Sequence, residues 1–226
     1  MSDTPHYGDA FAQWRAGAPS WQAYTRHRFV EGLADGSLPR DAFLHYLKQD
    51  YVFLIHFSRA WALAVVKADT LGEMTTAAAT VNALVNEEMQ LHVGICAAAG
   101  IDQATLEATA ERSENLAYTR YVLEAGYSGD FLDLLAALAP CVFGYGDIGL
   151  HTAATRSSDK YTDWIETYAG DDYQGLCVAV GGLIDGALLR RLGDGYADLP
   201  RFAQLQARFE RATALEVGFW DMGLRP

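Results

Sequence analysis

The stretch DFLDLLAALAPCVFGYGDIGLHTAAT, residues 130–155, has the periodicity of a long α-helix and sets the fold class of the chain. Its apolar side chains recur every three or four residues and therefore share one helix face: Leu134, Leu138, Cys141, Tyr145 and Ile148. Pro140 lies inside this pattern and has no backbone N–H to donate. We therefore expect a kink there, with the carbonyl of Ala136 freed from its helical hydrogen bond.

The same periodicity continues along the rest of the chain, and the composition agrees with it. The 226 residues include 36 Ala and 26 Leu but only 12 Val and 6 Ile, which favours helices over strands. Further helices are expected over residues 7–15, 20–33, 39–67, 71–99, 102–108, 113–125, 158–168, 171–192 and 199–222. Because the connections are short and linker-free, we predict an all-α, compact multi-helix bundle that forms one domain over residues 1–226.

Charge and cysteine usage exclude several classes of partner. The chain has 17 Lys and Arg against 29 Asp and Glu, a net charge of −12, and no basic cluster longer than Arg190-Arg191, so no nucleic-acid partner is expected. Residues 1–17 lack a signal-peptide pattern and no uncharged apolar run reaches transmembrane length, so no membrane partner is expected. Three widely spaced cysteines, at 96, 141 and 177, are typical of a protein in the reducing cytoplasm.

Two acidic residues interrupt apolar helix faces that are far apart in the sequence. Asp50 lies on an aromatic face between residues 43 and 61, and Glu216 lies on another between residues 202 and 220. A buried carboxylate is costly unless it is paired or hydrogen-bonded. Each acid is therefore either structural, bonded to a Tyr, an Arg or a backbone N–H, or functional. Two such acids together favour function more than either does alone.

Cys141 is also open to two interpretations. A free cysteine in a helix is usually a small core residue, and Cys96 and Cys177 fit that description because their neighbours are Ala, Val and Gly. A nucleophilic cysteine needs thiolate character, which the kink at Pro140 and a neighbouring Asp are candidates to supply.

Aromatic residues are abundant, and Tyr118, Tyr121 and Tyr168 are candidates for the wall of a pocket. Rings beside acids suit a flat, nitrogen-rich heterocycle, which stacks on the rings and donates hydrogen bonds to the carboxylates. Glu88 and His92 have the spacing of a helical metal pair, but the pattern is Glu-x-x-x-His and it is not repeated. We therefore expect a polar contact between packed helices there and predict no metal. The other histidines are scattered, and none is singled out as a haem ligand.

At these residues the sequence resembles the TenA family, the thiaminase II enzymes. The strongest segment is ALAPCVFGYGDIG, residues 137–149, which is similar to the family's Leu-Pro-Cys segment followed by an aromatic residue and a tyrosine. Four weaker segments recur in order: Gln49-Asp50, Tyr118-Thr119, WIETY at 164–168, and Glu216 followed by Phe219-Trp220. The resemblance covers nearly the whole chain, and Cys141 places it with the Cys-containing branch.

The resemblance implies a bundle of the haem oxygenase-like type, usually a homotetramer, that needs no metal or organic cofactor. Family members hydrolyse thiamin, or its base-degraded aminopyrimidine products, to the hydroxymethyl pyrimidine for salvage. By resemblance, Cys141 is the nucleophile and Asp50 binds the substrate amino group and helps to activate the thiol. Glu216 matches the acid that exchanges a proton with a pyrimidine ring nitrogen. The remaining matches are substrate-binding residues: Tyr118, Tyr145, Tyr168 and Phe219.

Phe53 departs from the family pattern, which often has a tyrosine three residues after the active-site Asp. We still place Phe53 among the substrate-binding residues, but the lost hydroxyl leaves Asp50 with one donor fewer and is expected to alter rate or substrate preference. Two alternatives stay open: a pyrroloquinoline quinone-type oxygenase on the same scaffold, which would want basic and His-rich contacts, and a non-enzymatic thiamin-binding or regulatory protein. The sequence does not choose between thiamin and an aminopyrimidine as substrate.

Overall fold

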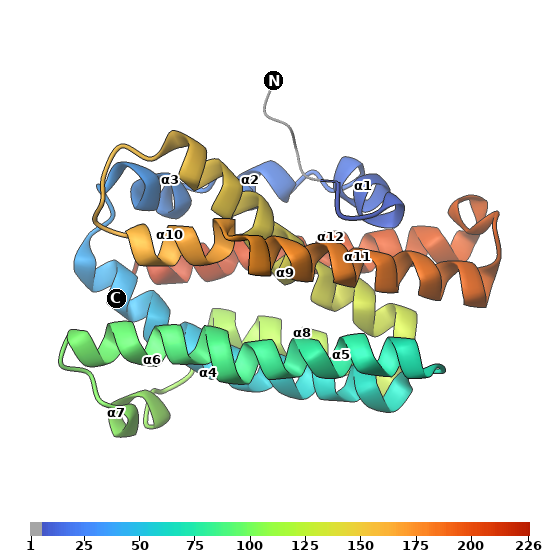
Figure 1. The fold of residues 1–226 in the computed structure, drawn as a ribbon, viewed down its shortest axis with the longest axis horizontal. Helices are drawn as coiled ribbons and strands as arrows, with labels where there is room; N and C mark the ends of the chain where they lie inside the picture. Colours follow the sequence, from blue (N-terminus) through green and yellow to red (C-terminus); the bar gives the residue numbers. More distant parts are fainter. Residues whose placement is uncertain (1–5) are drawn as a thin grey trace.

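A computed structural model describes residues 6–226, and within that range every regular element is a helix (Figure 1). The longer helices are α4 (Arg40–Lys67), α5 (Leu71–Ala83), α8 (Ser113–Ser128), α9 (Phe131–Thr155), α11 (Asp171–Leu192) and α12 (Pro200–Gly223). The shorter ones are α1 (Asp9–Ala16), α2 (Trp21–Thr25), α3 (Arg28–Asp35), α6 (Met89–Ala98), α7 (Gln103–Glu107) and α10 (Thr162–Ala169). A π-helical turn, Leu84–Glu88, joins α5 to α6, and a 3₁₀ turn, Tyr196–Asp198, precedes α12. The predicted all-α bundle is confirmed, while residues 1–5 of the predicted domain lie outside the described residues.

Helix α9 is the centre of the bundle. Every residue from Phe131 to Gly149 is buried, and α9 packs against α8, α10, α11 and α12. Figure 1 shows α4, α5, α6 and α8 on one side of the molecule and α10, α11 and α12 on the other, with α9 running obliquely between them. We expected no apolar run of transmembrane length, but α9 is long and apolar enough to cross a membrane. However, 94% of its apolar window is buried inside the bundle, so other helices take up that surface.

The start of α9 is fixed by two acids that cap each other. The Asp130 carboxylate accepts a hydrogen bond from the backbone N–H of Asp133, and the Asp133 carboxylate accepts one from the N–H of Asp130, both at 3.0 Å. Arg201 and Arg208 of α12 also bind Asp133, at 2.7 and 3.1 Å. Because α9 and α12 each carry one of the candidate catalytic residues, this clamp sets the position of one helix against the other.

The helix predicted over residues 20–33 is wrong in extent, because it is divided into α2 and α3. His27 has an extended backbone (φ −66°, ψ 150°), and its Nδ1 accepts a hydrogen bond from the N–H of Phe29 at 3.2 Å, so a second helix begins there. Arg26 is held by Asp147 of α9 at 2.9 Å. The local periodicity of residues 20–33 does not reveal this contact with a distant helix, so the break was not predicted.

Two other predicted helices also differ from the structure. The helix over residues 71–99 contains the π-helical turn, and the helix over residues 158–168 begins only at Thr162. Before it, Lys160 Nζ and Tyr161 Oη both donate to the carbonyl of Leu38, at 2.7 and 2.6 Å, which holds these residues in a loop. The remaining predicted boundaries agree with the structure to within about three residues. Helix α9 continues through Pro140.

Candidate active site

Cys141 of α9, Asp50 of α4 and Glu216 of α12 come together in the interior of the bundle. All three are buried, with Cys141 exposing 7% of its surface and each acid 2%. Burial raises the pKa of the Cys141 thiol well above its usual value, and the charges of Glu216, Glu88 and Asp50 raise it further, in that order. The thiol is thus protonated and faces three carboxyl groups. These charges oppose a resting thiolate, so a thiolate would have to form by transfer of the thiol proton to a neighbouring base.

Asp50 is held by tyrosines rather than by a cation. The Tyr46 hydroxyl donates to Asp50 Oδ2 at 3.0 Å, and it lies 3.3 Å from the Tyr145 hydroxyl. The indole N–H of Trp164 donates to the same Tyr46 oxygen at 3.4 Å. Burial, followed by the charge of Glu88, raises the pKa of Asp50 well above its ordinary value. In its ionised form a carboxylate with a raised pKa is a stronger base than usual, which is the property that uptake of a thiol proton requires.

Glu216 is the second acid of the site, and it too lacks a cationic partner among residues 6–226. The Tyr118 hydroxyl donates to Glu216 Oε1 at 2.8 Å. Burial raises the pKa of Glu216 to about 8, although the hydrogen bond from Tyr118 opposes this rise. Glu216 is therefore largely protonated at neutral pH and is able to donate a proton to a bound base.

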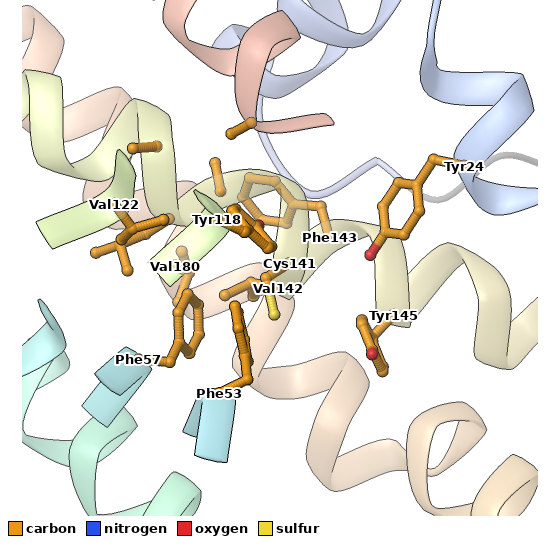
Figure 2. Close-up of a cluster of buried hydrophobic side chains, with 14 of the residues drawn as sticks. Tyr24, Phe53, Phe57, Tyr118, Val122, Cys141, Val142, Phe143, Tyr145 and Val180 are labelled. Atoms are coloured by element: carbon orange, nitrogen blue, oxygen red, sulfur yellow. The ribbon is translucent and has the colours of Figure 1, made fainter. Parts of the chain in front are cut away.

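The predicted substrate-binding residues form two aromatic groups, one beside each acid. Near Glu216, the ring of Phe53 lies 5.0 Å from that of Tyr118 and 5.5 Å from that of Phe219, between centroids. Near Asp50, the rings of Tyr145 and Tyr168 lie 4.9 Å apart. Figure 2 shows the Cys141 sulfur between these groups, with Phe53 and Tyr118 on one side and Tyr145 on the other. Tyr121 does not join them, because its hydroxyl donates to the carbonyl of Arg208.

Tyr24 of α2 also lies at the site, although no motif in the sequence points to it. Its ring lies against α9 at Gly144, where a Cβ atom would come within 2.1 Å of the ring. Its buried hydroxyl lies beside Glu216 and helps to restrain the rise in the pKa of that acid, but it makes no hydrogen bond of good geometry. Figure 2 shows this oxygen directed toward the site. In the sequence, Gly144 inside a helical pattern is the signal for a close approach by another residue, but it does not identify that residue as Tyr24.

Tyr46 belongs to the aromatic face between residues 43 and 61, and its hydroxyl connects Asp50 to Tyr145 and Trp164. Glu88 and His92 were expected to make a polar contact between packed helices. Glu88 does so, because the Tyr168 hydroxyl donates to its Oε1 at 2.7 Å. His92 Nδ1 lies 3.4 Å from Asp50 Oδ2 of α4, so a polar contact between helices forms there too, although neither ring nitrogen makes a hydrogen bond of good geometry within residues 6–226. Cys96 and Cys177 are buried packing residues, as expected.

A cavity of about 580 Å³ lies outside the Glu88–Tyr168 pair. Its walls come from the π-helical turn, from α6, and from the junction of α10 with α11. Glu88 lines this cavity together with Tyr173, whose ring lies 4.9 Å from that of Tyr168. Through its bond to Glu88, the predicted substrate-binding residue Tyr168 is therefore one contact away from the wall of this cavity.

Comparison with known proteins gives three findings. A sequence profile described as the TENA/THI-4/PQQC family matches residues 14–226. A crystal structure from Silicibacter sp. TM1040, described as a TenA family transcription regulator, is 66% identical, covers all of both chains and has a TM-score of 0.97. The aminopyrimidine aminohydrolase of Halalkalibacterium halodurans is 34% identical over 207 residues, which is 90% of each chain.

The fold itself is also found in a more distant structure. A domain of unknown function from Shewanella denitrificans, described as having a heme oxygenase-like fold, is 14% identical with a TM-score of 0.70. It covers 94% of this chain and 90% of its own length, and at that identity it shows the fold alone. The expected haem oxygenase-like bundle is thereby confirmed.

Proposed function

Because this chain belongs to the TENA/THI-4/PQQC family, we propose that it is an aminopyrimidine aminohydrolase, a thiaminase II that acts in thiamin salvage. Its substrate is thiamin or an aminopyrimidine product of thiamin degradation. The product is the hydroxymethyl pyrimidine. The observation that carries this proposal is the placement of one thiol between two buried carboxyl groups that have no cationic partner within residues 6–226.

The two acids suit the two ends of an aminopyrimidine. The exocyclic amino group donates hydrogen bonds, and the Asp50 carboxylate accepts them. A ring nitrogen is a weak base, and Glu216, with a pKa of about 8, is protonated and able to donate to it. Stacking on Phe53, Phe219 and the tyrosines would hold the flat ring between the acids.

The reaction then proceeds by covalent catalysis. Cys141 Sγ adds to the pyrimidine ring as its proton passes to Asp50, while Glu216 protonates the ring nitrogen. The leaving group departs from the exocyclic methylene as the ring electrons shift toward that bond. Water adds to the methylene and gives up one proton, which the departing amine takes, or solvent takes when a neutral thiazole has left. The thiol is then expelled as Asp50 returns its proton, and Glu216 recovers the ring-nitrogen proton. The net change is hydrolysis of one C–N bond.

A regulator that binds the same ligand without turnover is the second candidate. It is favoured by the description of the 66% identical relative as a transcription regulator. The net charge of −12 opposes it, since DNA binding normally needs a basic surface. The matched site also lacks the basic and His-rich contacts that an oxygenase of the pyrroloquinoline quinone type would want.

Chromatography of the protein mixed with thiamin, and separately with the aminomethyl pyrimidine, tests the proposal. We expect hydroxymethyl pyrimidine from the wild type and none from Cys141→Ser, and the faster substrate identifies the physiological class. A regulator would bind both compounds without forming product, and Cys141→Ser would leave its affinity unchanged. Product formation at the wild-type rate by Cys141→Ser would remove the nucleophilic role.

We also propose that residues 1–226 form one domain and that the chain is a cytoplasmic homotetramer, as the resemblance implies. Exposed apolar side chains on α5 and α11 support an assembly of copies: Leu71, Met74, Val178 and Leu189. Light scattering after gel filtration would measure the assembly. A monomer at micromolar concentration would contradict it.

A further inference from the structure

Asp50, Glu88 and His92 form a cluster from two facing segments of the bundle. Asp50 comes from α4, Glu88 ends the π-helical turn and His92 lies one turn later on α6. One ligand atom from each lies within 4.8 Å of the other two. His92 Nδ1 lies 3.4 Å from Asp50 Oδ2, a separation that neighbouring ligands of one metal ion adopt when each bond is about 2.1 Å.

The state of His92 is a second and independent observation that points to a ligand. Its side chain is fully buried, and both ring nitrogens lack a hydrogen-bond partner within residues 6–226. A buried polar group left in this way is rare, because it forfeits its hydration without compensation.

The two carboxylates are already oriented as ligands of a metal usually are. Tyr46 donates to Asp50 at 3.0 Å, and Tyr168 donates to Glu88 at 2.7 Å, so each acid has one oxygen fixed by a phenol. Two carboxyl groups at this distance in the interior repel each other when ionised. A divalent cation would remove that repulsion and balance both charges.

From this geometry we propose that Asp50, Glu88 and His92 bind one first-row divalent transition-metal ion. One imidazole and two carboxylates suit zinc, cobalt, manganese or ferrous iron. Glu88 also lines the 580 Å³ cavity, which provides an entry path and room for further oxygen ligands such as water. The ion is not part of the hydrolytic mechanism.

Occupation of this site has a consequence that rests on the proposed function. The metal and the substrate amino group both need the Asp50 carboxylate, so they compete for it. A divalent ion would therefore act as an inhibitor that is competitive with the aminopyrimidine. The same competition would make the metal-binding affinity fall when hydroxymethyl pyrimidine is present.

The test is calorimetric and spectroscopic titration of metal-free full-length protein with Co²⁺. We expect saturable binding of one equivalent, with visible absorption from the bound ion. Glu88→Gln and His92→Gln should each weaken binding by about 100-fold or more, since even the loss of an outer hydrogen-bond partner costs roughly 10- to 100-fold. Glu87→Gln is the matched control, because Glu87 is an exposed acid on the same turn and lies outside the cluster.

Absence of saturable binding in the wild type would overturn the site, and so would equal affinity in Glu87→Gln, Glu88→Gln and His92→Gln. Thermal melting identifies a variant that fails to fold. If His92→Gln fails to fold, Glu88→Gln still tests the site. Hydrolysis measured on the same metal-free wild type keeps the two proposals apart. Product without Co²⁺ binding refutes the metal site, whereas Co²⁺ binding without product refutes the hydrolase and leaves the site standing.

Discussion

Glu73 and Glu216 are two poorly exposed glutamates of one bundle that end in opposite states. Glu73 of α5 exposes 4% of its surface and Glu216 of α12 exposes 2%. Glu73 binds Arg191 at 2.7 Å and Arg190 at 3.4 Å, and hydrogen bonds from Arg191 lead the lowering of its pKa to about 2. Glu216 has Tyr118 as its partner, and burial raises its pKa to about 8.

The difference lies in the partner and not in the residue type. At the edge of the bundle arginines neutralise Glu73 and Asp133, and these acids tie helices together. Around Cys141 the acids meet phenols, which donate hydrogen bonds but carry no positive charge. The fold thus keeps the interior acids ready to exchange protons, at a cost in stability.

Among the substitutions that test this difference between the two acids, Glu216→Gln should have the largest effect. We expect the rate of hydrolysis to fall by about 10²- to 10⁴-fold, because an amide cannot give up and recover the proton. The fold should remain intact, since a neutral amide replaces an acid that is mostly neutral already. Steady-state kinetics and circular dichroism check the two statements. Full activity in this variant would remove the proton-transfer role.

The second effect is a pH dependence of stability that Glu216 should impose. Its pKa rises from 4.5 to about 8 on folding, so the folded state holds a proton that the unfolded state has released. Stability contributed by the protonated acid is therefore present below pH 4.5 and is lost as the pH rises through about 8. Between pH 5 and pH 7.5 the wild type should lose about 3 kcal/mol relative to Glu216→Gln. Urea unfolding of both proteins at the two pH values measures this, and parallel pH profiles would contradict it.

Removal of Glu73, the acid paired with arginine, should lower the stability of the protein and leave its activity unchanged. Glu73→Gln leaves Arg191 partly buried without its partner, and we expect the free energy of unfolding to fall by about 2 kcal/mol. The rate of hydrolysis per folded molecule should not change. Glu166→Gln, which breaks an exposed pair with Arg156, is the control and should change stability little. A loss of activity in folded Glu73→Gln would contradict the conclusion that Glu73 stabilises the fold without taking part in the reaction.

The smallest effect is expected for Tyr24→Phe. The buried hydroxyl makes no hydrogen bond of good geometry, so its removal should leave stability unchanged or raise it by up to about 1 kcal/mol. If Tyr24 assists Glu216 once substrate is bound, kcat/KM should fall by about fivefold, and its alkaline limb should shift to higher pH. Kinetics across pH 6–9 would show this. An unchanged pH profile would leave Tyr24 with a packing role only.

The pattern of residues predicted most of the helices and which of their faces are buried. Apolar residues at intervals of three or four predicted α9 and the interior positions of Asp50 and Glu216, because a helix face is a property of one segment. The same pattern, together with the motif around Cys141, was sufficient to indicate the family. The resemblance to that family supplied the proposed substrate-binding residues, whose rings lie in two groups in the structure.

Which partners those residues meet depends on how the helices pack against one another. Tyr24 reaches the site because α2 packs on α9 at Gly144, and His92 approaches Asp50 because the π-helical turn and α6 lie against α4. The break between α2 and α3 depends on Asp147, which lies more than a hundred positions away and binds Arg26. The protonated state of Cys141 depends first on its burial. Periodicity reports the direction in which a side chain points, whereas charge, hydrogen bonding and pKa depend on what another helix places there.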